Sequence, residues 1–140
     1  MNAPIERCFD LARNIDLHVK SMERSGEQAI AGRRNGLIGL NESVTWRAKH
    51  FGIYFNMTSK ITAMERPNFF IDDMVEGPFK KLHHQHCFKT MGTQTEMTDI
   101  FEFGAPFGIL GRLAEKIFLE KYMRQLLVER NKVIVRFSRA

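Results

Sequence analysis

Apolar and polar residues alternate with a period of two through most of the middle of the chain. The clearest case is the stretch in which Val44, Trp46 and Ala48 alternate with polar neighbours. Such alternation predicts strands with one buried face. The predicted strands are 28–31, 44–50, 55–63, 69–75, 81–89 and 97–103. Short turns containing Gly or Pro separate most of them, which predicts antiparallel neighbours in chain order.

Both ends of the chain have helical spacing instead. Near the start, apolar residues recur three and four apart, with Asn2 as a possible cap, and a second short helix is predicted over 16–22. Near the end, 109–137 predicts one long helix with an apolar stripe that includes Leu113 and Ile117. A helix of that length spans roughly 40 Å, so only a sheet that curls around it could cover the stripe. The pattern predicts a single α+β domain over 1–140.

Composition narrows the class of protein further. The chain has 140 residues and 44% hydrophobic content, as in an ordinary globular domain. No leader and no long apolar run is evident, so we expect a cytoplasmic protein without stable membrane insertion. Cys8 and Cys87 lack metal or redox spacing and are expected to be reduced thiols. Twelve Phe and eight Met would suit either a filled core or an apolar pocket.

The positive charge is concentrated in the last segment. The whole chain carries a net charge of +5, and residues 112–140 hold eight Lys and Arg against three Glu. A basic helix can attract nucleic acid or anionic lipid. The Glu residues interrupt the basic stripe, however, and cations near a helix C-terminus suit the helix dipole. We therefore expect a solvated helix face and no nucleic-acid partner.

Five stretches of the sequence match motifs of a known superfamily: NAPIERCFDL (2–11), GLIGLNESVTWRAKHFG (36–52), GPFK (77–80), HQHCF (84–88) and TDIFEFGAP (98–106). They resemble the START/Bet v1-like (SRPBCC) superfamily, in particular a bacterial branch of polyketide-cyclase-like ligand-binding proteins. The resemblance covers essentially the whole chain. It implies a helix-grip fold, in which a curved antiparallel sheet of about six strands wraps around the C-terminal helix behind two short N-terminal helices.

One departure from the family concerns the start of the sheet. The family places a strand before the APIE motif, whereas only Met1 and Asn2 precede it here. Without that strand an edge of the sheet would be exposed. We therefore expect either pairing between edges, as in a homodimer, or an N-terminus that covers the gap.

A few polar side chains share the parity of the apolar, inward-facing residues. His84, His86 and Asp99 are the candidates for acid–base chemistry, because His titrates near neutral pH and a carboxylate can orient it. The same three side chains could hold a metal ion, although no metal site and no cofactor are expected. The predicted ligand contacts are Trp46, Phe55, Met57, Ile61, His84, His86, Met97, Asp99, Phe101, Leu113 and Ile117.

Three classes of function remain open from the sequence. The first is binding of a hydrophobic small molecule, such as a lipid, isoprenoid or polyketide-like compound, between the sheet and the C-terminal helix. The second is an enzyme of the cyclase/aromatase kind, less favoured, with His84 or His86 as acid/base and Asp99 as the orienting group. The third is a homo-oligomeric or protein-interaction module that uses an exposed sheet edge.

Overall fold

The computed structural model describes residues 1–104 and 112–139, and the side chains of all of these except 112–116. Two short helices, α1 (Ile5–Ala12) and α2 (Ile15–Ser21), precede a 3-10 turn, η1 (Glu23–Ser25). Six strands follow, and the long helix α3 (Arg112–Ser138) closes the chain. The strands are β1 (Gln28–Gly32), β2 (Ser43–His50), β3 (Ile53–Glu65), β4 (Phe69–Glu76), β5 (Lys81–Met91) and β6 (Gln94–Gly104).

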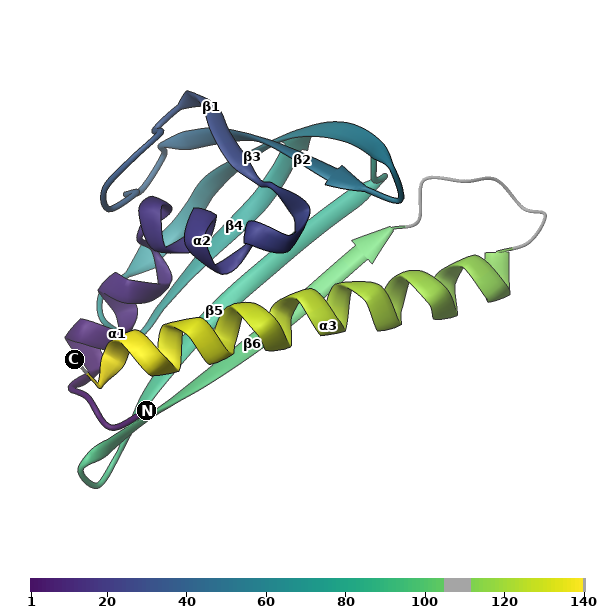
Figure 1. Ribbon diagram of the computed structural model, residues 1–140. Helices are drawn as coiled ribbons and strands as arrows, with labels where there is room; N and C mark the ends of the chain where they lie inside the picture. The colour runs from purple at the N-terminus through teal and green to yellow at the C-terminus, as the bar shows by residue number, and fades with distance from the viewer. Residues whose placement is uncertain (105–111, 140) are drawn as a thin grey trace.

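The strands form one antiparallel sheet in chain order, from β1 to β6. The sheet curves, α3 runs lengthwise across its concave side, and the two short helices lie at one end of α3, near both chain termini (Figure 1). The alternation in the sequence accounts for this sheet, because Val44, Trp46 and Ala48 are buried while their polar neighbours face outward. The predicted α+β architecture and the six strands are confirmed.

The N-terminal helices begin differently from the prediction. Pro4, not Asn2, occupies the N-cap of α1, and no side chain caps that helix. The side chain of Asn2 instead accepts a hydrogen bond from Gln94. Asn14 caps α2 by accepting the backbone N–H of Leu17 at 3.1 Å. The break between the helices is therefore a cap, as expected for an Asn that competes for backbone donors.

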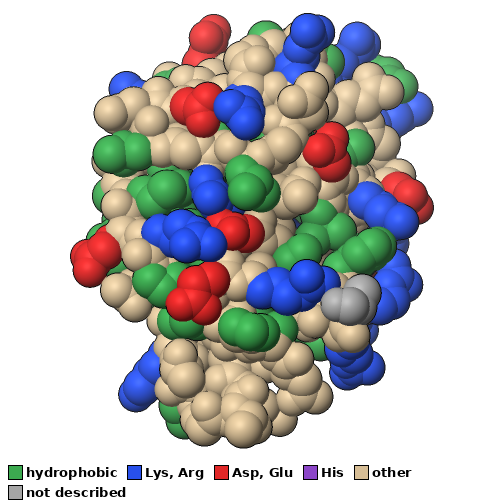
Figure 2. Space-filling model, turned by 90° about the vertical axis from the view of Figure 1, so that its left-hand side faces the viewer, with side chains coloured by type: hydrophobic (Ala, Val, Ile, Leu, Met, Phe, Trp, Pro, Cys, Tyr) green, Lys and Arg blue, Asp and Glu red, His purple; other side chains and the backbone are tan. Residues whose placement is uncertain are grey.

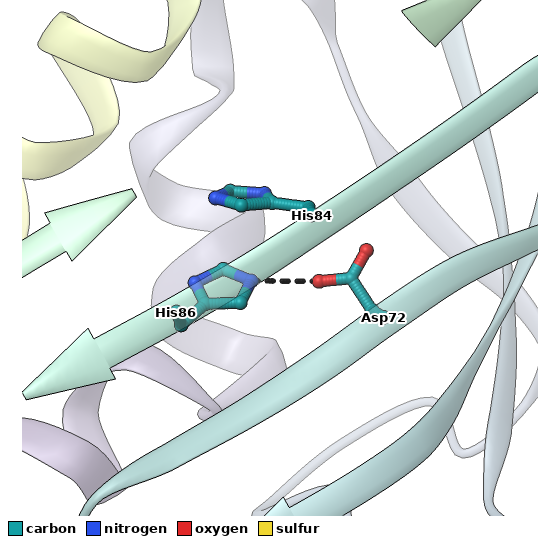
Figure 3. A group of neighbouring side chains, drawn as sticks. All are labelled: Asp72, His84 and His86. Carbon is teal, nitrogen blue, oxygen red and sulfur yellow. Dashed lines mark hydrogen bonds and ion pairs between the residues drawn. The ribbon is translucent and has the colours of Figure 1, made fainter. Parts of the chain in front are cut away.

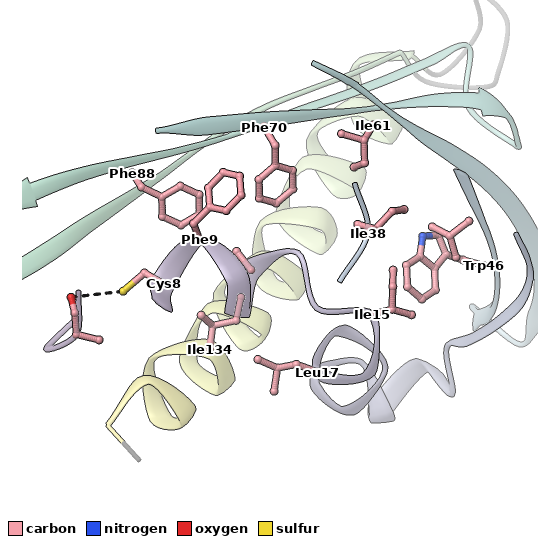
Figure 4. Packing of buried hydrophobic residues seen from close by; sticks show 13 residues of the cluster. Cys8, Phe9, Ile15, Leu17, Ile38, Trp46, Ile61, Phe70, Phe88 and Ile134 are labelled. Carbon is pink, nitrogen blue, oxygen red and sulfur yellow. Dashed lines mark hydrogen bonds between the residues drawn. The ribbon is translucent and has the colours of Figure 1, made fainter. Parts of the chain in front are cut away.

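Phe9 on α1 is the centre of the aromatic packing between the helices and the sheet. It is fully buried, and its ring meets those of Phe70 and Phe88 edge-on, with centroids 5.3 and 5.5 Å apart. Ile134 reaches the same core cluster from α3 (Figure 4). The aromatic part of the core thus lies beside α1, whereas other members of the same cluster, among them Trp46 and Ile61, line a cavity between the sheet and α3.

The outer edge of β6 is paired at one residue of the described chain. Met1 donates its terminal ammonium to the carbonyl of Thr95 at 2.7 Å and accepts the N–H of Thr95 at 2.8 Å. Among the described residues, no backbone hydrogen bond to another segment occupies the same edge at Met97, Asp99 or Phe101. The exposed edge expected from the sequence is present there, and Met1 covers only its beginning.

Two further features concern the surface charge and the hydrophobicity of the helices. On the face shown in Figure 2, Lys and Arg side chains are distributed with Asp and Glu between them. No helix in the described part of the chain is long and apolar enough to cross a membrane.

Candidate functional site

A cavity of about 290 Å³ lies between the sheet and α3. Apolar side chains from β2 and β3 line it on one side, among them Trp46, Met57 and Ile61. Leu126 and Leu127 of α3 line it on the other. The wall of the cavity is thus built from the inward-facing residues of the strands and from one side of the helix.

The structure brings most of the predicted ligand contacts to this cavity, but not all of them. Met97 packs against the hydrophobic core instead, and Asp99 does not line the cavity but is hydrogen-bonded to His84, which does. The side chain of Leu113 lies outside the described residues. The predicted contacts that line the cavity are Trp46, Phe55, Met57, Ile61, His84, His86 and Phe101.

Ile117 is a correction to the predicted helix face. Its side chain is 49% exposed and does not line the cavity. Among the described side chains of α3, the ones that line the cavity are instead Leu119, Tyr122, Met123, Leu126, Leu127 and Arg130. Residues two apart on a helix point in nearly opposite directions, so a stripe through Leu119 excludes Ile117.

One part of the cavity wall is a buried polar cluster, formed by Asp72, His84, His86, Asp99, Arg130 and Asn131. Nε2 of His84 lies 2.8 Å from Oδ1 of Asp99. Nε2 of His86 lies 2.7 Å from Oδ2 of Asp72. The two imidazole rings stack with centroids 3.7 Å apart (Figure 3). Each histidine is therefore oriented by its own carboxylate, on adjacent strands of one sheet face.

Helix α3 completes the cluster with Arg130 and Asn131. The side chain of Asn131 donates to Oδ2 of Asp99 at 2.6 Å. The guanidinium of Arg130 donates to the carbonyl of Ala12 at 3.0 Å and to the side chain of Asn131 at 3.2 Å. It also lies 3.9 Å from Asp99. A buried arginine next to a carboxylate requires such partners, because an unpaired buried charge is costly.

The environment holds both carboxylates ionised. Burial acts to raise the pKa of Asp99, but the hydrogen bond from His84, the charge of Arg130 and the hydrogen bond from Asn131 outweigh it and keep that pKa well below its ordinary 3.8. Burial likewise opposes the hydrogen bond from His86 at Asp72, whose pKa is about 2. Both carboxylates are therefore hydrogen-bond acceptors at neutral pH.

His86 is neutral under the same conditions. Burial lowers its pKa from the ordinary 6.5 to about 3, and the proximity of His84 adds to that shift against the opposing pull of Asp72. Nε2 carries the hydrogen that is donated to Asp72, so Nδ1 is left as an acceptor. Nδ1 is buried and has no hydrogen-bond partner in the described structure. Oδ1 of Asp99, which is another acceptor, lies 3.6 Å from it.

Three residues of the cluster could in principle hold a metal ion. Asp72, His84 and His86 each offer one ligand atom, and these atoms lie within 4.8 Å of one another. The set differs from the one considered from the sequence, which used Asp99 in place of Asp72. Two imidazoles and one carboxylate suit a transition metal. An ion bound by Nε2 of His86 would have to replace the hydrogen bond from that atom to Asp72.

Sequence reasoning missed Asp72 and Arg130. Both parities of the stretch over 69–75 carry apolar residues, so the alternation did not show which of Asp72 and Asp73 faces inward. The structure turns Asp73 outward to His83 and Thr62. Arg130 was counted with the solvated helix face, but it is 4% exposed. Its position four residues after Leu126 and three after Leu127 was the signal that could have revealed it.

Two further polar pairs border the cavity. His18 bonds Glu27 at 2.6 Å and packs against Trp46. Nδ1 of His50 lies 2.5 Å from the hydroxyl of Tyr122. Burial lowers the pKa of His50, although the charge of Glu27 opposes this. These pairs satisfy polar groups in a mainly apolar wall.

The curved sheet and the long helix define a helix-grip protein of the Bet v1-like fold. The chain is similar over 99% of its length to TTHA0849 from Thermus thermophilus, with a TM-score of 0.75, 19% identity and 94% of that chain covered. Ara h 8.0201 matches with a TM-score of 0.63 and 12% identity, over 96% of this chain and 92% of that one.

A Staphylococcus epidermidis protein with a solution NMR structure gives the same TM-score of 0.63 and 12% identity, over 96% of this chain and 84% of that one. No family model matches the sequence. No curated protein matches it either.

Proposed function

We propose that the protein binds a small hydrophobic molecule in the cavity between the sheet and α3. The observation that supports this most directly is a cavity of about 290 Å³ with mainly apolar walls and a polar cluster at one part of its lining. Small-molecule sites commonly combine these two features at volumes of roughly 300–1,000 Å³. A lipid, isoprenoid or polyketide-like compound fits this description, as the resemblance to the START/Bet v1-like superfamily also implies.

Trp46 allows the proposal to be tested directly. It is the only tryptophan of the chain, and it lines the cavity. A ligand that enters should change the intrinsic fluorescence, and N-phenyl-1-naphthylamine should bind with increased emission of its own. Native mass spectrometry of gently purified protein would detect a ligand that remains bound. Protein that is empty in the spectrometer and binds no apolar probe would contradict the proposal.

A matched pair of variants on β2 separates the cavity from the surface. Ala48 is 5% exposed and lines the cavity, whereas its neighbour Lys49 faces outward. Ala48→Phe should fill part of the space and weaken probe binding at least tenfold. Lys49→Phe adds the same ring outside and should leave binding unchanged. Equal effects of the two substitutions would show that the probe binds the surface.

A second candidate function is acid–base catalysis, as in cyclases of the resembled branch. The supporting observation is the bond between His84 and Asp99 at 2.8 Å, beside the cavity. When an imidazole is in its neutral form, a carboxylate that accepts Nε2–H leaves Nδ1 as a general base. His84 would take a proton from carbon next to a carbonyl, leaving an enolate and an imidazolium. Exchange of that proton for deuterium in D₂O, followed by NMR on a β-ketoester probe, should be lost in His84→Ala.

The open edge of β6 supports a third candidate, pairing with the β6 strand of a second copy. The backbone groups of Met97, Asp99 and Phe101 point outward in the same register as Thr95. An antiparallel partner centred on Ile100 would place Ile100 opposite its own copy and satisfy these groups. Light scattering coupled to size-exclusion chromatography tests this, and a monomer at high concentration would contradict it.

A further inference from the structure

The buried polar cluster presents unbonded acceptors to the cavity. Oδ2 of Asp72 takes the hydrogen bond from His86, and no described residue bonds its Oδ1. His84 uses Nε2 for Asp99, and no described residue bonds its Nδ1. Both residues line the cavity, and 22% of the Asp72 side chain is exposed. A ligand that meets this part of the wall encounters lone pairs and needs hydrogen-bond donors.

The guanidinium of Arg130 lies close to only one of the two carboxylates of the cluster. Asp99 lies 3.9 Å from Arg130 and also receives Asn131, so the positive charge belongs mainly to Asp99. Asp72 receives one side-chain hydrogen bond, from His86, and no Lys or Arg nitrogen of the described residues lies within 4 Å of it. A carboxylate in a mainly apolar cavity without an opposite charge is costly, and a cation next to it would remove that cost.

We propose that this part of the cavity binds the protonated amine of an amphiphilic ligand. The ammonium group donates to Oδ1 of Asp72 and Nδ1 of His84, and the apolar body extends along the wall that contains Trp46. The inference rests on the proposed binding function and names the chemical class of its ligand. An ammonium group supplies both the missing charge and the missing donors, whereas an alcohol supplies only a donor.

A ligand carboxylate fits the cluster less well. Arg130 is the cationic member, but its Nη atoms already bind Ala12 and Asn131. An anion beside it would also face the carboxylates of Asp72 and Asp99. The net charge of the cluster would then become more negative in a medium that screens charge poorly.

A metal ion also fits less well in the observed arrangement. The rings of His84 and His86 are stacked, with an interplanar angle of 25°, so their lone pairs lie side by side instead of converging on one point. His86 also already donates to the carboxylate that would have to share the ion. Metal binding therefore requires the rings to separate, whereas an ammonium group uses the acceptors that are free.

Three probes of equal chain length test the inference: octylamine, 1-octanol and octanoate. Binding at pH 7 is followed by Trp46 fluorescence and by calorimetry on the wild-type protein. We expect octylamine to bind at least tenfold more tightly than either other probe. Equal or tighter binding of octanol or octanoate would overturn the inference and leave the proposed function intact. Failure of all three to bind would count against the proposed function itself.

Two neighbouring aspartates provide the variant and its control. Asp72→Asn keeps the shape and removes the charge, so octylamine affinity should fall about tenfold while octanol affinity stays the same. Asp73 lies on the opposite face, bound to His83, so Asp73→Asn should change neither. If Asp72→Asn does not fold, the ranking of the three probes on the wild-type protein still shows whether the cavity prefers an ammonium group. Stoichiometric Zn²⁺ binding that displaces octylamine and is lost in Asp72→Asn would instead assign the cluster to a metal ion.

Discussion

Asp99 and His84 are joined across a diagonal of the sheet. The residue directly opposite Asp99 in the pairing of β5 with β6 is His86, yet the hydrogen bond of 2.8 Å goes to His84. Asp72 makes the same kind of diagonal hydrogen bond, since it lies opposite His84 in the pairing of β4 with β5 and bonds His86. The two diagonals bring the imidazole rings face to face. A change at either carboxylate therefore affects both histidines.

Replacing Asp99 by Asn tests how strongly α3 depends on this carboxylate. The substitution removes the negative charge nearest to the buried guanidinium of Arg130. We expect the free energy of unfolding to fall by about 3–5 kcal/mol, the usual cost of leaving one partner of a buried ion pair. Urea titration followed by circular dichroism measures it.

The double variant provides the control. Arg130→Met alone should also destabilise the protein, partly because the carbonyl of Ala12 loses its partner. Combined with Asp99→Asn, the loss should be smaller than the sum of the two single losses, since neither charge is then left alone. Strict additivity would show that the two side chains do not interact.

Acid should destabilise the protein earlier than its carboxylates alone predict. His86 has a folded pKa of about 3 against 6.5 when unfolded, so between these values the unfolded chain binds a proton that the folded chain does not. The free energy of unfolding therefore decreases as the pH falls from about 6.5 towards 3. Below the ordinary 3.8 of Asp72, whose folded pKa is about 2, a second loss begins.

A variant at position 86 isolates the first of these effects. His86→Gln cannot titrate, and the groups that face it (His84, Asp72, Asp99 and Arg130) remain. Urea titrations at several pH values should show a shallower decline between pH 6.5 and 4 than in the wild type. An identical slope would mean that His86 does not control acid stability.

Phe9 should be among the most costly residues to truncate. It is fully buried between Phe70 and Phe88 and links α1 to the sheet. Phe9→Ala removes a ring from a packed core and should cost about 3–5 kcal/mol of unfolding free energy. Phe51 is 55% exposed, so Phe51→Ala should cost far less. Comparable losses would contradict the assignment of the core.

Two glycines at similar backbone angles separate strain from crowding. Gly32 and Gly52 have φ of +71° and +77°, where a side chain is unfavourable. A Cβ at position 32 would overlap the carbonyl oxygen of Ser43, whereas nothing in the described structure lies within 4 Å of one at position 52. Gly32→Ala should therefore destabilise the protein more than Gly52→Ala, with an additional loss of unfolding free energy of about 1–3 kcal/mol and a lower melting temperature. Equal effects would contradict the close packing of β1 against β2.

Leu126 and Ile117 test which face of α3 meets the ligand. Leu126 lines the cavity, and Ile117 does not. Leu126→Trp should block the cavity and weaken binding of N-phenyl-1-naphthylamine at least tenfold, whereas Ile117→Trp should leave its affinity unchanged. The reverse result, measured by probe fluorescence, would restore the helix face expected from the sequence.

The sequence was informative wherever a pattern repeats. Alternation and turn residues together located the six strands, and alternation predicted that His84 and His86 face inward, because one buried face suffices to fix the parity of a strand. The facing of Asp72 was not accessible in this way, since apolar residues occupy both parities of β4. That facing depends on how β4 pairs with its neighbours, which is a property of the whole sheet.

The prediction of which face of α3 lines the cavity was wrong for a different reason. A helix with apolar residues on several sides does not show which of them faces the sheet, and Ile117, Phe118 and Leu119 are consecutive. Arg130 was misplaced because a long basic side chain is usually solvated. Its burial depends on Ala12 and Asp99, which are far away in the sequence and become neighbours only in the fold.

The bond between Arg130 and Ala12 has a consequence for how the protein is made. Its two residues are 118 positions apart, and the guanidinium comes from the last element of the chain. On the ribosome, domains form from the N-terminal end, and contacts between distant residues form late. The concave side of the sheet, with its aromatic and aliphatic side chains, therefore stays open until α3 has emerged. We expect premature termination before residue 112 to yield an aggregation-prone fragment that depends on chaperones, instead of a smaller folded protein.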